Sequence, residues 1–353
     1  MKKSLVALAL MGAFSAAYAQ SSVTIYGTVD AGVTKTSGGT TSIGKRDNNK
    51  LGFKGVEDLG SGLKALFQLE IRYEPDTGTI ESVTRPLFQG ESRVGLQGDF
   101  GTVRLGRGLT ALQASNTAFE PWSGLPTPAG FQTDLQVAGY TSAYKSTHKP
   151  LPDTISGSDP LGPAGNSSNR FSNALFYNTP VFAGFQLNVT VATKEGNGNT
   201  APVAQYPIGA TASVNPYSVS GTYNNGPVAA MAAYERNAVE TKLWSIAAAV
   251  TPVTGLKLMG SYQKQDQAHT QPINPDTKSW ILGANYTVGA GKFLLGYGQK
   301  TPDGRDKTKQ ASAGYEYSLS ARTYLYGELS NRKNSVMQGD SVNYYGLGIH
   351  HNF

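Results

Sequence analysis

Apolar side chains alternate with small or polar ones along nearly the whole chain from about residue 20 to the C-terminus. In residues 63–73, for example, every second residue from Leu63 to Tyr73 is apolar or aromatic, and Lys64, Gln68 and Arg72 lie between them. A period of two residues is that of a β-strand whose two faces meet different surroundings. Such strands are about 9 to 14 residues long, which suits a tilted strand that crosses a membrane. The pattern predicts an all-β chain.

The connections between these strands indicate which face meets lipid. In a soluble β-sandwich the apolar face packs into a core, whereas in a membrane barrel it faces lipid and the polar face points inward. Short turns are expected at 58–62, 99–102, 179–184, 224–227, 251–255, 288–291 and 318–321. Longer polar segments are expected at about 35–49, 75–88, 110–169, 195–216, 236–241, 266–277, 302–308 and 333–341. Seven short and eight long connections in alternation predict a 16-stranded antiparallel transmembrane β-barrel.

The N-terminus has the features of an export signal. Lys2 and Lys3 precede an apolar run over 5–17, and Ala17-Tyr18-Ala19 follows it with small residues at the positions a signal peptidase reads. The run is too short to span a bilayer as a helix. We therefore expect residues 1–19 to be a signal peptide, cleavage between Ala19 and Gln20, and one barrel domain over 20–353. The chain has no cysteine, so disulfides do not hold this fold together.

Composition and motifs exclude several other classes of protein. A mean hydropathy of −0.30 does not fit a bundle of membrane helices. The net charge of +6 is dispersed, with no basic run carrying interleaved aromatics, so no nucleic-acid partner is expected. None of the four histidines lies in a nucleophile motif, and the adjacent His350 and His351 point to opposite faces of a strand. We expect no enzyme activity, cofactor or metal, and rank a barrel enzyme and a soluble β-sandwich as weak alternatives.

Several segments resemble one known family. The quoted segments are "SSVTIYGTVDAGV", "KLGFKGVEDLGSGLKALFQLE", "GDFGTVRLGRGL", "NALFYNTPVFAGFQLNVTVA", "YNNGPVAAMAAY", "SARTYLYGELS" and "YYGLGIHHNF". In this order they resemble the Gram-negative porins, most closely the general trimeric porins of the β-proteobacterial type. The resemblance implies a passive outer-membrane channel for ions and small hydrophilic solutes, surrounded by outer-membrane lipids. It also implies a homotrimer, in which the chain binds two copies of itself.

The same resemblance assigns roles to particular segments. It implies that the third external loop, about 110–169, folds into the lumen to form a constriction, and that Phe353 is the signal read by the barrel assembly machinery. The span from about 111 to 169 is longer than this loop usually is. A substrate-specific channel for sugars or carboxylates is the alternative function.

Alternation also predicts the lining of the pore. It places Lys50, Arg72, Arg93 and Arg104, together with Lys54, on the inward faces of neighbouring strands, so that one wall becomes basic. Strict alternation would instead aim Arg107 at lipid, where an arginine at the midplane costs about 2–4 kcal/mol. A β-bulge at Gly106 or Gly108 would turn it inward.

The resemblance implies that Lys50 and Arg107 are bases of the constriction, whereas Arg93 is placed there by alternation alone. Opposite these bases, the third loop is expected to present acids, Glu120 first and Asp134 second. Several bases against few acids predict a mild preference for anions.

Overall fold

The computed structural model describes residues 22–81, 85–132, 135, 166, 169–194, 214–266, 276–303, 307–335 and 339–353. Within these residues one antiparallel sheet contains sixteen long strands and the three-residue strand β2 (Ser42–Gly44). The long strands are β1 (Ser22–Thr36), β3 (Lys50–Gly60), β4 (Leu63–Arg72), β5 (Glu91–Gly98), β6 (Gly101–Leu109), β7 (Arg170–Asn178), β8 (Phe185–Ala192), β9 (Tyr217–Asn225), β10 (Val228–Arg236), β11 (Lys242–Val253), β12 (Leu256–Asp266), β13 (Thr277–Val288), β14 (Gly291–Pro302), β15 (Thr308–Ser318), β16 (Thr323–Ser335) and β17 (Gly339–Asn352).

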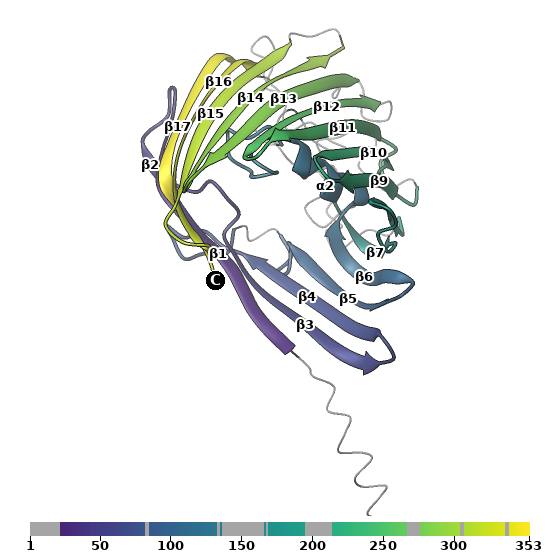
Figure 1. Ribbon diagram of the computed structural model, residues 1–353. Coiled ribbons are helices and arrows are strands. Elements are labelled where there is room, and N and C mark those ends of the chain that lie inside the picture. The colour runs from purple at the N-terminus through teal and green to yellow at the C-terminus, as the bar shows by residue number, and fades with distance from the viewer. Residues whose placement is uncertain are drawn as a thin grey trace, which may run out of the picture.

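The sheet closes into a barrel because its first and last strands pair. Residues Thr28–Thr36 of β1 lie antiparallel to Tyr344–Asn352 of β17, and every other long strand pairs with its neighbours in sequence. Figure 1 shows the resulting curved wall, with the yellow C-terminal strands beside the purple β1. The prediction of a sixteen-stranded barrel is confirmed, and the connections fall within a few residues of those expected. Closure pairs the first and last strands with each other over Thr28–Thr36, so this stretch of edge is not open to another chain.

Strand β1 changes partner half-way along. Its lower part, Ser22–Thr28, pairs with β3, and its upper part, Gly32–Thr34, pairs with β2. Between them, the Asn49 side chain accepts a hydrogen bond from the backbone N–H of Asp30 and donates one to the Asp30 carbonyl at 3.0 Å. This amide takes the place of a strand partner at the gap, so the backbone groups of Asp30 stay satisfied.

The two faces of the wall differ as the alternation predicts. One face carries exposed apolar side chains all round the barrel, for example Val94 at 60%, Leu295 at 55% and Leu347 at 67% exposure. Tilted aromatic pairs lie on the same face, as in Trp244 with Tyr262 at 5.4 Å between ring centroids. We call this the outer face and the opposite one the inner face. Among the described residues, no helix is long and apolar enough to cross a membrane.

The described part of the third loop packs against the inner face. It begins with helix α2 (Ala111–Asn116), capped by the Thr110 hydroxyl, which accepts from the Gln113 N–H at 3.2 Å. The short helix η1 (Thr117–Phe119) follows. Figure 1 shows α2 inside the curve of the wall, beside β9 and β10.

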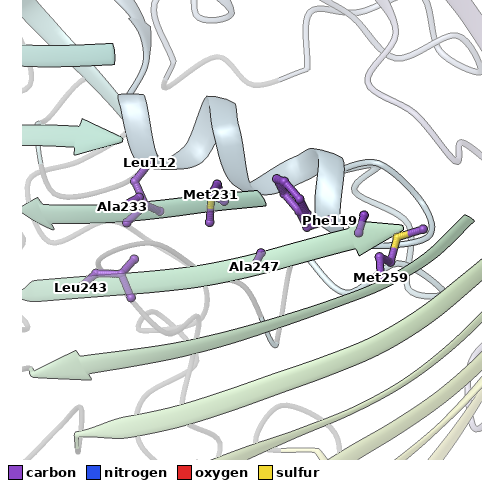
Figure 2. Close-up of a cluster of buried hydrophobic side chains, with 8 residues drawn as sticks. Leu112, Phe119, Met231, Ala233, Leu243, Ala247 and Met259 are labelled. Atoms are coloured by element: carbon purple, nitrogen blue, oxygen red, sulfur yellow. The ribbon is translucent and has the colours of Figure 1, made fainter. Parts of the chain in front are cut away.

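Two apolar clusters hold this segment in place. In the first, Leu112 and Phe119 of the loop pack on Met231, Leu243 and Met259 of the wall, as Figure 2 shows. The second contains loop residues Trp122, Ala129, Phe131 and Leu135 with wall residues Ile281, Leu294 and Tyr344. Many apolar side chains on the inner face thus gather under the loop, and a third cluster of Phe171, Ala174, Phe176 and Ala192 lies on β7 and β8.

Candidate functional site

The inner face of β3, β4 and β5 carries a row of basic side chains. Residues directly opposite each other on paired strands share a face. Lys50 lies opposite Arg72, and Lys54 lies opposite Gln68, which in turn lies opposite Arg93. The register therefore places these four bases on one face, as alternation predicts. We call them, together with Arg104 of β6, the basic wall.

Acids on the same face partly neutralise the basic wall. Glu70 lies opposite Glu91. Each of these acids forms an ion pair with an arginine two residues away on its own strand. Arg93 Nε is 2.8 Å from Glu91 Oε2, and Arg72 Nη2 is 3.5 Å from Glu70 Oε1. Among the described residues, the remaining members of the basic wall, Lys50, Lys54 and Arg104, form no ion pair with an acid. The wall keeps a positive excess.

A cavity of about 430 Å³ separates part of the basic wall from the third loop. Arg93 and Arg104 line one side, and Ala111, Ala114 and Ala118 of the loop line the other. Glu91, Lys257 and apolar side chains such as Phe119 and Phe176 also line it, as do amide and hydroxyl side chains: Asn178, Gln186, Asn188, Thr190, Thr222 and Asn224. The cavity thus carries Arg93, Arg104 and Lys257 against the single acid Glu91, and the loop bounds its other side.

Hydrogen bonds hold the two arginines of this cavity in position. The Arg93 guanidinium donates to Gln68 Oε1 at 3.0 Å and lies 5.4 Å from the centroid of the Phe176 ring. The Arg104 guanidinium donates to Asn178 Oδ1. Arg104 is therefore held by a neutral partner that leaves its charge in place, whereas Arg93 is held by neutral Gln68 and by the carboxylate of Glu91.

A β-bulge lies beside Arg107, as expected, but in the partner strand. The register of β6 with β7 shifts between Gly106 and Gly108, and β7 has one extra residue there, because Ser172 and Asn173 both stand opposite Arg107. Against β5, Arg107 stays opposite Ser92, whose neighbour Arg93 belongs to the basic wall. The bulge is therefore present in β7 and not, as expected, at Gly106 or Gly108 of β6. The Arg107 guanidinium donates to Ser172 Oγ at 2.7 Å and to the Gln89 carbonyl at 3.1 Å.

Glu120 lies inside its own loop and has no exposed surface. Its carboxylate accepts hydrogen bonds from the backbone N–H of Trp122 at 2.9 Å and from that of Gly124. Burial raises the pKa of this carboxyl to about 7, and the two N–H donors offset only part of that effect. Glu120 therefore shapes the loop and does not face the pore. The second expected acid, Asp134, lies outside the described residues.

A family model described as Gram-negative porin matches residues 5–336. The chain belongs to the Gram-negative porin family. Outer membrane porin protein 32 of Delftia acidovorans is 33% identical to it over 385 aligned residues, covering 100% of each chain. Among solved structures, the anion-selective porin from Comamonas acidovorans matches with a TM-score of 0.73 at 27% identity, covering 95% of this chain and 100% of that one.

A further solved structure, the trimer form of OmpT from Vibrio cholerae, is alike in fold at a TM-score of 0.59 and 13% identity, covering 94% of this chain and 99% of that one. These findings make this porin a passive, water-filled channel of the outer membrane, crossed by the strands of its barrel. Its relatives are channels and not enzymes.

The remaining predicted site residues lie at the chain ends. Phe353 closes the barrel seam, because its backbone N–H and carbonyl both bond to Gly27 at 3.1 Å. Ala19 and Gln20 lie outside the described residues. Of the histidines, His351 is exposed, whereas His350 is buried and its Nδ1 lies 3.0 Å from Asp30 Oδ2.

Sequence reasoning missed a buried charged cluster at β1, β15 and β16 of this porin. Arg46 of the first external loop lies among Asp30, Glu316 and Glu328, and all four side chains are largely withdrawn from solvent. The acids carry a signal in the sequence, since Glu316 and Glu328 occupy polar positions of alternating strands. The sequence has no such signal for Arg46, because its position depends on how the first external loop folds into the barrel.

Proposed function

We propose that this porin conducts small anions in preference to cations, and that its constriction lies between the basic wall and the third loop. The positive excess of Lys50, Lys54 and Arg104 on the inner face carries the proposal. Charges that line a narrow water-filled zone with low-dielectric walls set the local concentration of ions of the opposite sign. The similarity to a porin that is itself anion-selective supports the same direction.

The test is the zero-current potential of the purified porin in a planar bilayer with a KCl gradient. A potential with the sign expected for chloride permeation supports the proposal. A potential with the sign for potassium permeation refutes it, and so does a potential of zero.

A channel specific for carboxylates is the second candidate function. The cavity beside Arg93 and Arg104 favours it, because amide and hydroxyl side chains there could solvate an organic acid. Under this alternative, adding a carboxylate to one side of the bilayer reduces the ionic current with saturation at low concentration. A general diffusion channel shows only a small and linear decrease.

We further propose that the porin is a homotrimer without enzyme activity or cofactor, exported after cleavage between Ala19 and Gln20. Phe353 would be read by the barrel assembly machinery before it closes the seam beside Gly27. A trimer band that dissociates on heating in a denaturing gel would support the assembly. The mass of the mature chain tests the cleavage site.

A further inference from the structure

The first external loop enters the barrel at Arg46. The Arg46 side chain is only 1% exposed, and its backbone N–H donates to Asp30 Oδ1 of β1 at 2.6 Å. The neighbouring Lys45 points elsewhere, since its Nζ lies 2.6 Å from Glu74 Oε1 and 3.1 Å from Glu81 Oε1 of the second loop. Two consecutive cations thus tie the first loop to two different parts of the barrel.

The Arg46 guanidinium binds two acids on neighbouring strands of the wall. Its Nη2 is 2.5 Å from Glu316 Oε1 of β15, and its Nε is 3.1 Å from Glu328 Oε2 of β16. Its central carbon also lies 4.9 Å from the ring centroid of Tyr326 and 5.6 Å from that of Tyr324. A planar guanidinium can satisfy two carboxylates and stack on aromatic rings at once, which the point charge of a lysine cannot do.

Glu328 also binds the third loop. Its Oε2 accepts from the Trp122 indole N–H at 2.8 Å, and its Oε1 accepts from the Thr127 hydroxyl. Trp122 is 1% exposed, and its ring lies against Gly314, where an added Cβ would be 3.2 Å from it. One carboxylate therefore joins the cation of the first loop to two residues of the third loop.

This carboxylate depends on Arg46 for its charge balance. Glu328 is 6% exposed, and burying a carboxylate is costly unless a cation or several donors compensate it. Glu316 has a second cation, Lys292, whose Nζ is 3.2 Å away. Among the ion pairs of the described residues, Glu328 has Arg46 alone. Removing Arg46 thus affects Glu328, and with it Trp122, more than it affects Glu316.

We propose that Arg46 is a positioning residue for the constriction: through Glu328 it holds the segment from Trp122 to Thr127 of the third loop against β15 and β16. The first external loop thereby sets the width and steadiness of the channel. This inference rests on the third loop forming the constriction, as proposed above. It concerns how the third loop is held, whereas the zero-current potential reports the charges of the basic wall on β3, β4, β5 and β6.

A single-tryptophan variant tests the link directly. The chain has three tryptophans, so replacing Trp244 and Trp280 by Phe leaves Trp122 as the only one. In this background, Arg46→Gln should increase the quenching of Trp122 fluorescence by acrylamide. Glu328 then no longer fixes the indole through its hydrogen bond, and the indole becomes more accessible to acrylamide. Lys45→Gln is the matched control, since it removes the same charge from the neighbouring residue without touching Glu328. Equal quenching in the two variants would overturn the proposal.

Two further variants test the route through Glu328 and cover the case in which Arg46→Gln does not assemble. Arg46→Gln combined with Glu328→Gln should quench no more than Arg46→Gln alone, and additive quenching would exclude the route through Glu328. If Arg46→Gln does not assemble into a heat-modifiable barrel, Arg46→Lys replaces it. The lysine variant should also raise quenching above the control, and no rise would overturn the proposal.

Single-channel recording completes the experiment. Arg46→Gln should lose the steady open level and show sub-conductance states that Lys45→Gln lacks, while both keep the same sign of zero-current potential as the parent. A steady current in Arg46→Gln would contradict the inference about the loop and leave the proposed ion preference standing. A reversed potential in the parent protein would instead contradict the proposed function.

Discussion

Glu120 and Arg104 show how surroundings give two charged residues inside one barrel different roles. Arg104 lines a polar cavity and donates to the side chain of Asn178, so its charge can act on passing ions. Glu120 is enclosed by its own loop and accepts from backbone N–H groups. Burial disfavours its charged form, and its pKa rises to about 7.

The raised pKa makes the loop sensitive to pH. Below pH 4.5, the ordinary value, Glu120 is protonated in both the folded and the unfolded chain, and its contribution to stability is complete. Between pH 4.5 and about 7 only the folded chain keeps the proton, so stability falls as the pH rises. Glu120→Gln should remove this part of the pH dependence. Thermal unfolding midpoints of both proteins in detergent between pH 5 and 8 measure it, and equal slopes would contradict the raised pKa.

For single residues, the alternation within a strand predicted which face some side chains occupy, but it did not predict the surroundings of others. The inward faces of Lys50, Arg72 and Arg93 follow from a period of two residues within one strand. The setting of Arg107 depends on a bulge in β7, more than sixty residues further along the chain. That of Glu120 depends on a loop fold for which the sequence has no periodic signal.

Among the strands, β6 pairs regularly with β5 on one side and irregularly with β7 on the other. Its pairing with β5 is continuous, and its pairing with β7 shifts beside Gly106, where φ is +129°. L-residues with a side chain rarely adopt that conformation. A Cβ on Gly106 would also lie 2.0 Å from the Ser92 carbonyl oxygen. Glycine is therefore required where β6 bends between its two partners.

Substituting Gly106 by Ala should lower the free energy of unfolding by about 1–3 kcal/mol, because both the backbone conformation and the contact with Ser92 become strained. Gly221→Ala in β9 is the control, since a Cβ there would meet nothing within 4 Å. Urea unfolding of the two variants in lipid vesicles measures the difference. Equal midpoints would contradict the requirement for glycine at Gly106.

Strand ends were predictable because turn-forming residues stand beside them in the sequence. The short strand β2 and the bridging amide of Asn49 were not, since both depend on the upper half of β1 having lost β3 as its partner. Long-range pairing decides such features, and a single sequence gives no register between distant segments.

The whole molecule is an inside-out protein, with its apolar face to lipid and its polar face to water. Leu295 lies on the outer face near the middle of β14, and Thr222 lines the cavity on the inner face. Leu295→Arg should lower the free energy of unfolding in a bilayer by about 2–4 kcal/mol. Thr222→Arg places the same side chain in water and should cost far less. Urea unfolding from vesicles compares them, and equal costs would contradict the assignment of the faces.

Under the proposed function, charges on the inner face alone set which ions pass. The most direct test compares the zero-current potentials of two variants in a KCl gradient. Arg104→Glu changes a charge on the inner face, and Lys278→Glu changes one on the exposed outer side of β13. We predict that the Arg104 variant shifts toward potassium permeation and that the Lys278 variant keeps the chloride preference of the parent. Equal shifts in the two variants, or no shift in the Arg104 variant, would contradict the claim.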